Sequence, residues 1–276
     1  MQDLRVTLIQ ASTVWHDAAA NRALYGGLCL SVKGQTDLIV LPETFLSGFS
    51  TDVAANALSM QSESIEWLKT LAKQCGAVVT GSIVISAGDN LGTDALPNSN
   101  KAFNRLIWMR PDGTHSYYDK RHLFRMAGEH ERFGMGQTRL IVELQGWRIC
   151  PMVCYDLRFP VFARNRFRDA KPENRDYDAL IFVANWPSPR SYAWKTLLRA
   201  RAIENLSYCV GVNRTGTDGN NLNYSGDSAV LDFLGQPMIE CGAQSQVVTT
   251  TLSWNALQEH RSRFPAYLDA DEFELK

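Results

Sequence analysis

The stretch ICPMVCYDLRFP, residues 149–160, is the clearest indication of the architecture of this chain. Its first six residues are apolar or small, and the run ends at Cys154. A tyrosine, an aspartate and an arginine follow within four residues, and Pro160 closes the segment. A buried strand that passes directly into such a polar cluster is typical of the strand ends that line the ligand crevice of layered α/β proteins. We therefore predict that Cys154 stands where a buried strand ends.

The composition is that of a folded globular protein, with 276 residues, of which 45% are hydrophobic and 21% charged. The formal net charge is -1 and there is no basic stripe, which argues against a nucleic-acid partner. No apolar stretch approaches the ~20 residues needed to cross a bilayer. The N-terminal segment MQDLRVTLIQ also lacks the pattern of a signal peptide. These features predict a cytoplasmic protein that is not bound to membranes.

The cysteines indicate the same compartment. They are scattered through the chain, and most lie in or next to apolar segments, as expected for reduced, buried thiols. No pair of cysteines or histidines has the spacing of a structural zinc site, so we expect no metal. The six are Cys29, Cys75, Cys150, Cys154, Cys209 and Cys241.

Short β-rich runs alternate with helical patterns along the chain. Predicted strands cover residues 4–10, 37–42, 77–85, 139–144, 147–154, 178–186, 207–214, 227–235 and 245–252. Residues 102–120 read as a hairpin with a Pro-Asp-Gly turn, and residues 18–32, 63–74 and 191–205 as helices, the second capped by Ser62. No repeat or linker interrupts the chain. The pattern predicts one domain, residues 1–276, with two mixed sheets packed face to face and helices outside.

Three predicted strand ends carry chemically reactive side chains. Glu43 follows residues 37–42, Lys120 is the last residue of the hairpin, and Cys154 is the last residue of the strand 147–154. An ordinary glutamate, with a pKa near ~4.3, is a poor base toward a thiol whose pKa is near ~8.5. Burial raises the pKa of a glutamate and a neighbouring ammonium lowers that of a cysteine, so we expect the two values to converge. The cysteine could then attack a carbonyl or nitrile carbon, with a lysine and a backbone N–H group stabilising the oxyanion.

The segments LPETF, YYDKRHLF and CYDLRFP, in this order and spacing, resemble the Glu, Lys and Cys motifs of the nitrilase (carbon–nitrogen hydrolase) superfamily. The similarity extends over nearly the whole chain, and residues 184–205 resemble the omega-amidase branch. The resemblance implies an α-β-β-α sandwich, no cofactor, and a homodimer or larger assembly. It also implies that Glu43 is the base, Lys120 the oxyanion stabiliser and Cys154 the nucleophile.

Several further residues are candidates for the same site. The family often has a second glutamate after the lysine; Glu129 and Glu131 both fit, and Glu129 is preferred because it follows a glycine turn. The backbone N–H group of Tyr155 is a candidate oxyanion donor. The remaining candidates would contact the substrate: Phe124 and Trp186 as walls, and Arg190 or Arg158 as the partner of a substrate carboxylate. Of the two arginines Arg190 is preferred, because we expect Arg158 to pair with Asp156 or another buried carboxylate.

The predicted function is hydrolysis of the terminal amide of a small α-keto acid ω-amide, such as 2-oxoglutaramate or 2-oxosuccinamate, through a cysteine thioester. A nitrilase or an N-carbamoyl amidohydrolase of the same superfamily remains an alternative. A binding protein that retained the fold and lost the activity is another, although a complete set of Glu43, Lys120 and Cys154 argues against it. Release of ammonia from an amide distinguishes these hypotheses.

Overall fold

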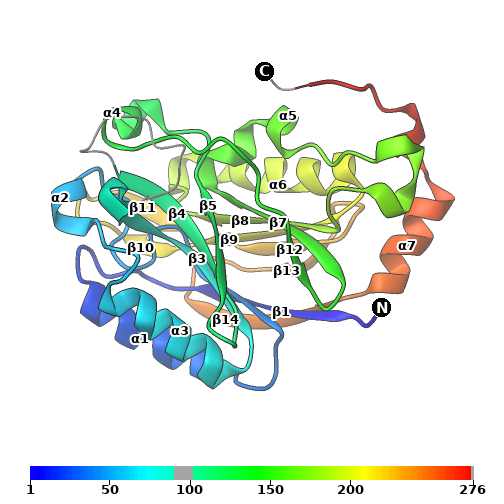
Figure 1. The fold of residues 1–276 in the computed structure, drawn as a ribbon. Helices are drawn as coiled ribbons and strands as arrows, with labels where there is room; N and C mark the ends of the chain where they lie inside the picture. The colour runs from blue at the N-terminus through cyan, green and yellow to red at the C-terminus, as the bar shows by residue number, and fades with distance from the viewer. Residues whose placement is uncertain (90–101, 275–276) are drawn as a thin grey trace.

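The computed structural model describes residues 1–89 and 102–274, and its core is a pair of six-stranded sheets packed face to face (Figure 1). The first sheet has the order β14-β1-β2-β3-β4-β5. Its strands β1, β2 and β3 are parallel, whereas the neighbours on either side run antiparallel to them. The strands are β1 (Leu4–Gln10), β2 (Leu38–Val40), β3 (Val78–Ser86), β4 (Ala102–Met109), β5 (His115–Asp119) and β14 (Gln246–Leu252).

The second sheet has the order β13-β12-β9-β8-β7-β6, again with three parallel strands, β7, β8 and β9, flanked by antiparallel ones. Its strands are β6 (Val142–Leu144), β7 (Trp147–Val153), β8 (Ala179–Ala184), β9 (Tyr208–Asn213), β12 (Ala229–Leu231) and β13 (Pro237–Glu240). A separate two-stranded ribbon joins β10 (Thr215–Thr217) to β11 (Asn223–Ser225).

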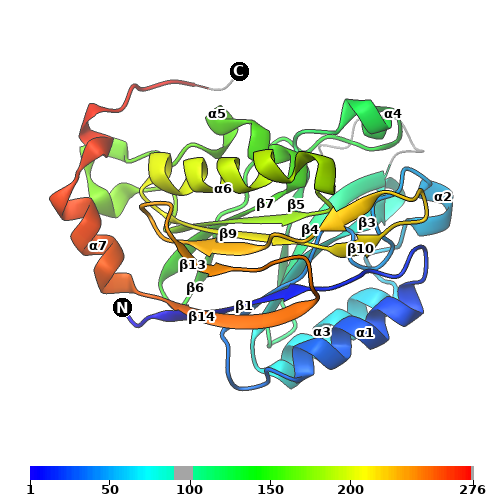
Figure 2. The same cartoon turned by 180° about the vertical axis from the view of Figure 1, so that it is seen from behind.

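Helices cover the outer faces of both sheets (Figures 1 and 2). The first sheet is covered by α1 (Ala18–Leu30) and α3 (Glu63–Cys75), and the second by α5 (Pro160–Ala163) and α6 (Ser191–Asn205). The other helices are α2 (Val53–Asn56), α4 (Glu129–Arg132) and α7 (Trp254–Arg263). Short 3-10 turns are η1 (Ala87–Asp89), η2 (Arg125–Ala127), η3 (Cys154–Arg158), η4 (Arg168–Ala170), η5 (Pro172–Asn174), η6 (Ser188–Arg190) and η7 (Ala266–Asp269).

The layers follow from strands that are apolar on both faces. In β2, Leu38 and Val40 pack into the cluster between the sheets, whereas Ile39 joins the cluster under α1 and α3. Such two-sided burial is what a strand in the middle of a covered sheet requires. The predicted α-β-β-α sandwich of two mixed sheets is confirmed. No helix in residues 1–89 and 102–274 is long and apolar enough to cross a membrane.

Some predicted boundaries and contacts were wrong. The strand predicted for residues 139–144 is reduced to β6, and Arg139 lies before it with its side chain paired to Asp176. The first helix ends at Leu30 and not at residue 32. Ser62 stands at the N-cap of α3, but its hydroxyl makes no capping hydrogen bond. The prediction also missed β13, which has only four residues, and α7, whose sequence is mostly polar.

Candidate active site

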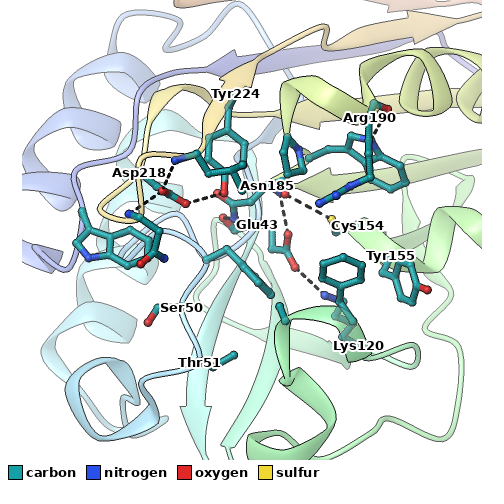
Figure 3. A pocket seen from close by; sticks show the side chains of 18 of the residues that line it. Glu43, Ser50, Thr51, Lys120, Cys154, Tyr155, Asn185, Arg190, Asp218 and Tyr224 are labelled. Atoms are coloured by element: carbon teal, nitrogen blue, oxygen red, sulfur yellow. Dashed lines mark hydrogen bonds and ion pairs between the residues drawn. The ribbon is translucent and has the colours of Figure 1, made fainter.

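Glu43 lies in the loop after β2 and is completely buried. Its Oε1 accepts hydrogen bonds from Lys120 Nζ at 3.0 Å and Asn104 Nδ2 at 2.8 Å. Its Oε2 accepts the backbone N–H of Asn185 at 2.8 Å. A buried carboxylate must be paired or hydrogen-bonded, and three donors satisfy this one. The carboxylate is therefore held in one orientation at the interface of the two sheets (Figure 3).

Lys120 follows β5 and is 1% exposed. Its Nζ contacts both oxygens of Glu129, at 3.0 and 2.9 Å, in addition to Glu43. Burial alone would lower the pKa of this ammonium, but the carboxylates of Glu129 and Glu43 hold the pKa above its ordinary value. Lys120 is thus a permanent positive charge and cannot serve as a base.

The two candidates for the second glutamate differ completely in position. Glu129, at the start of α4, is fully buried and also accepts the backbone N–H of Phe124 at 2.6 Å. The side chain of Glu131 is 69% exposed and lies near His130. Burial raises the pKa of Glu129, with Glu43 adding to the effect and Lys120 opposing it. Of the two glutamates, only Glu129 contacts Lys120.

Cys154 is the first residue of η3 and has a φ of 45°, in the left-handed region that a non-glycine residue rarely adopts. The turn places Sγ 4.0 Å from the carbonyl oxygen of Asn185 and leaves the residue 9% exposed. The amide of Tyr155 lies at the start of the same turn, where N–H groups have no acceptor within the helix. This geometry presents the sulfur to the cavity and places the backbone amide of Tyr155 next to it.

One expectation about the thiol was wrong. We predicted that the pKa of Cys154 would fall toward that of Glu43, but burial and the negative charge of Glu43 together raise it well above its ordinary value. Lys120 opposes this only in part. The cysteine at rest is therefore a neutral thiol, and its proton can leave only as the sulfur reacts. Cys150, four residues earlier, belongs to the core, where burial raises its pKa to about 12.

These groups open into a cavity of about 480 Å³. Phe124, Tyr155 and Trp186 line the part of it near Cys154, and Phe124 packs edge to face on Tyr155 with ring centroids 5.0 Å apart. The more distant wall is formed by Trp15, His16, Ser50, Thr51, Asp52, Asp218, Asn220, Leu222 and Tyr224. The size suits a small molecule with several carbon atoms, and the aromatic walls would exclude water around it.

Arg190 and Arg158 also line the cavity. The guanidinium carbon of Arg190 lies 5.3 Å from the ring centroid of Phe124, and that of Arg158 lies 4.8 Å from Trp186. Within the described part of the chain, neither guanidinium has an ion pair. The cavity therefore offers two unpaired positive charges to an anionic group.

The expected pairing of Arg158 with Asp156 was wrong, because Asp156 is already saturated with other donors. The hydroxyl of Tyr118 donates to it at 2.7 Å and the backbone N–H of Val153 at 3.0 Å. His122 contributes its backbone N–H at 3.0 Å and its Nδ1 at 2.8 Å. Asp156 thereby ties the cysteine turn to the segment that carries Lys120.

Sequence reasoning missed two asparagines at this site. Asn185 follows β8 and donates its side-chain amide to the backbone oxygen of Glu43 at 2.6 Å, so its place at a strand end was a usable signal. Asn104 lies inside β4, in phase with the buried Leu106 and Trp108. A polar residue on the buried face of an apolar strand is a weaker signal, but it requires a partner.

The fold and this constellation of glutamate, lysine and cysteine define a carbon–nitrogen hydrolase. Residues 5–262 match the carbon-nitrogen hydrolase family model, and the chain belongs to that family. It is 45% identical to the omega-amidase YafV of Escherichia coli K12 over the full length of both chains. It is 34% identical to the 2-oxoglutaramate amidase of Paenarthrobacter nicotinovorans, covering 87% of this chain and 80% of that one.

A solved structure supports the same assignment. XC1258 of Xanthomonas campestris, described as a CN-hydrolase superfamily protein with an arsenic adduct in the active site, is 55% identical to this chain. The TM-score is 0.93 and the match covers 100% of both chains. Nit3 of Saccharomyces cerevisiae, at 24% identity, shows the same fold with a TM-score of 0.80.

Proposed function

We propose that this protein is an omega-amidase that hydrolyses the terminal amide of a short α-keto acid ω-amide of the 2-oxoglutaramate or 2-oxosuccinamate type. The observation that carries the proposal is the full-length similarity to the omega-amidase YafV, at 45% identity. The cavity supports it, because unpaired guanidinium groups lie beside a buried thiol and a buried carboxylate. A keto-acid amide has the matching pattern, with a carboxylate at one end and the scissile amide at the other.

In the first step, Sγ of Cys154 attacks the amide carbon while the ionised carboxylate of Glu43 takes the thiol proton. This coupling follows from the raised pKa of Cys154, which prevents a free thiolate from accumulating. The carbonyl oxygen becomes negative, and the ammonium of Lys120 and the N–H group of Tyr155 stabilise it. One such donor is worth about 3 kcal/mol in the transition state.

In the second step, the protonated Glu43 gives its proton to the amide nitrogen, the C–N bond breaks, and ammonia leaves a thioester on Cys154. Water then enters the space that ammonia vacated, and Glu43 takes a proton from it as the oxygen attacks the thioester. The C–S bond breaks, the acid leaves, and the proton returns to the sulfur. Glu129 stays beside Lys120 throughout and fixes its position.

Arg190 is our choice for the partner of the substrate carboxylate. It lies in the turn after β8, and its backbone oxygen accepts the indole N–H of Trp186 at 2.8 Å, which fixes the turn against the cavity wall. A buried carboxylate without a cation costs several kcal/mol, so a keto-acid amide requires such a group. Arg158, whose guanidinium lies over the ring of Trp186, is the alternative partner for the carboxylate.

The test compares charged and neutral amides of equal length by ammonia release. We expect wild-type protein to hydrolyse 2-oxoglutaramate far faster than a neutral aliphatic amide or a nitrile. Arg190→Ala should raise KM for the charged amide about 10- to 100-fold and leave the neutral amide unchanged. Arg158→Ala is the matched comparison, and the larger effect identifies the carboxylate partner. Equal turnover of neutral amides or nitriles would contradict the omega-amidase proposal.

We also propose that the protein works in the cytoplasm as a homodimer or larger assembly. All six cysteines are free and buried, as suits a reducing compartment. Val161, Tyr192 and Ile203, on α5 and α6, are 52%, 82% and 51% exposed, more than isolated apolar side chains on a solvated helix face require. Sedimentation of a fully active monomer at working concentration would contradict the assembly.

A further inference from the structure

We propose that Asn104 is a positioning residue, whose side-chain amide holds the carboxylates of Glu43 and Glu129 and keeps Glu43 ionised beside Cys154. The inference rests on the proposed function of the site. Asn104 Nδ2 lies 2.8 Å from Glu43 Oε1 and 3.4 Å from Glu129 Oε1. The residue is 1% exposed, so water does not compete for these hydrogen bonds.

The orientation of the amide follows from its surroundings. Asn104 Oδ1 is buried and has no hydrogen-bond partner within residues 1–89 and 102–274. The opposite orientation would place that oxygen against two carboxylates and turn both N–H donors away from them. A buried acceptor without a partner destabilises the fold. We therefore infer that the role of Asn104 lies in its donor, the side-chain N–H groups.

The backbone couples the same residue to the lysine. The N–H group of Lys120 donates to the carbonyl oxygen of Asn104 at 3.0 Å, directly beyond the β4–β5 pairing. A shift of β4 at this point would therefore move both Lys120 and the side-chain amide of Asn104 that faces the two carboxylates. Asn104 thus contacts Glu43 and Glu129 through its side chain and Lys120 through its backbone.

Charge explains why the cluster needs a further donor. One ammonium, that of Lys120, faces two carboxylates, so one negative charge has no cationic counterpart. Among the described residues, the Cys154 thiol and the Tyr224 hydroxyl also lie near these carboxylates and are not positive, and Arg158 and Arg190 line the same cavity without an ion pair to either carboxylate. A protonated Glu43 could not accept the thiol proton. Hydrogen bonds to the ionised form of a carboxylate favour that form, which is what Asn104 provides.

Alkylation of Cys154 by iodoacetamide, followed as a function of pH, tests this without depending on the natural substrate. As the S–C bond forms, iodide leaves and the thiol proton passes to the ionised carboxylate. Asn104→Leu keeps the approximate size and removes the donor. We expect the acid limb of the pH profile to move upward by about one pH unit, because a lost hydrogen bond to a buried charge makes ionisation harder. The acid limb of kcat/KM should move with it.

Thr80→Val is the matched control. Thr80 is fully buried in β3, and its hydroxyl donates to the backbone oxygen of Ile107 at 2.9 Å, away from the carboxylates. This variant also removes one buried donor from the first sheet, and its pH profile should stay where it is. The background from other thiols is measured with Cys154→Ala. If Asn104→Leu does not fold, Asn104→Ala is read in the same assay.

The outcomes separate this inference from the proposed function. A uniform loss of rate at every pH, with the acid limb unmoved, would overturn the role of Asn104. An upward shift in alkylation, in a protein that does not hydrolyse keto-acid amides, would support Asn104 and overturn only the substrate assignment. An acid limb that moves equally in Thr80→Val would show that any lesion in β3 or β4 has this effect, and the inference would fail.

Discussion

The two sheets have the same arrangement but contribute different chemistry. Each has three parallel strands, β1-β2-β3 and β7-β8-β9. On one side a single strand, β14 or β6, pairs antiparallel with this trio. On the other side lie two more strands, β4-β5 or β12-β13, each antiparallel to its neighbours. The sequence shows no repeat that would reveal this correspondence. Strands at corresponding places end in different side chains: Glu43 follows β2 and Asn185 follows β8, while Cys154 follows β7.

The two sheets therefore supply different parts of the site. The first sheet supplies the buried charges, Glu43 and Lys120, together with the asparagine that holds them. The second supplies Cys154, the N–H groups of Tyr155 and Asn185, and the arginines of the cavity. Because Asn185 of one sheet donates to Glu43 of the other at 2.8 Å, the site exists only when the sheets face each other. Neither half contains a complete acid–base and nucleophile set.

The largest expected effect tests the contribution of the second sheet. Cys154→Ala should reduce ammonia release by about four orders of magnitude or more, as removal of a nucleophile does in comparable enzymes. Alanine adopts the φ of 45° no less readily than cysteine, so circular dichroism and thermal midpoint should be close to those of the parent. Cys150→Ala, on the same strand, should retain most of the activity. The reverse ranking of the two variants would refute the nucleophile assignment.

A smaller loss is expected when the charge of the first sheet is kept and only its shape is changed. Lys120→Arg should lose about 10²- to 10³-fold in kcat, because a planar guanidinium cannot take the place of a compact ammonium between two carboxylates. Lys195→Arg provides the control, since Lys195 pairs with Asp227 in a partly exposed position. Near-normal kcat in the Lys120 variant would mean that charge alone suffices, and that the first sheet is less demanding than its geometry indicates.

The smallest effect concerns stability. The raised pKa of Glu129 means that the folded protein binds this proton more tightly than the unfolded chain does. Its contribution to stability is therefore present at low pH and is lost as pH rises from the ordinary value of 4.5 through the folded-state pKa. Relative to the parent, the free energy of unfolding of Glu129→Gln, measured by urea denaturation, should increase as the pH rises above 4.5.

The exposed Glu131 is the natural control for that measurement. Glu131→Gln changes the same functional group two residues away, where the side chain is 69% exposed. Its free energy of unfolding should follow the parent at every pH. If the two glutamine variants showed the same pH dependence, burial of Glu129 would not be the source of the effect.

Local sequence patterns were sufficient to predict the layers of the fold and the strand ends that carry Glu43, Lys120 and Cys154. In each case an apolar run passes into a polar residue within the same short segment. They were insufficient where a property depends on distant parts of the chain. Asp156 takes its distant partners, Tyr118 and His122, from one other segment, and the raised pKa of Cys154 depends on a carboxylate 111 positions away in the numbering. Asn104, inside a strand, differs from a structural asparagine only through its contacts.

The pairing of β1 with β14 has a consequence for biosynthesis. All seven residues of β1, from Leu4 to Gln10, pair with residues 246–252. While the ribosome is still making the chain, β1 therefore has an unpaired edge, although β2 and β3 are already available on its other side. Free edges of this kind can pair with other chains, so we expect newly made molecules to be prone to aggregation before residue 252 emerges. Conditions that slow translation of the last thirty or so residues should lower the soluble yield without altering the stability of the finished protein.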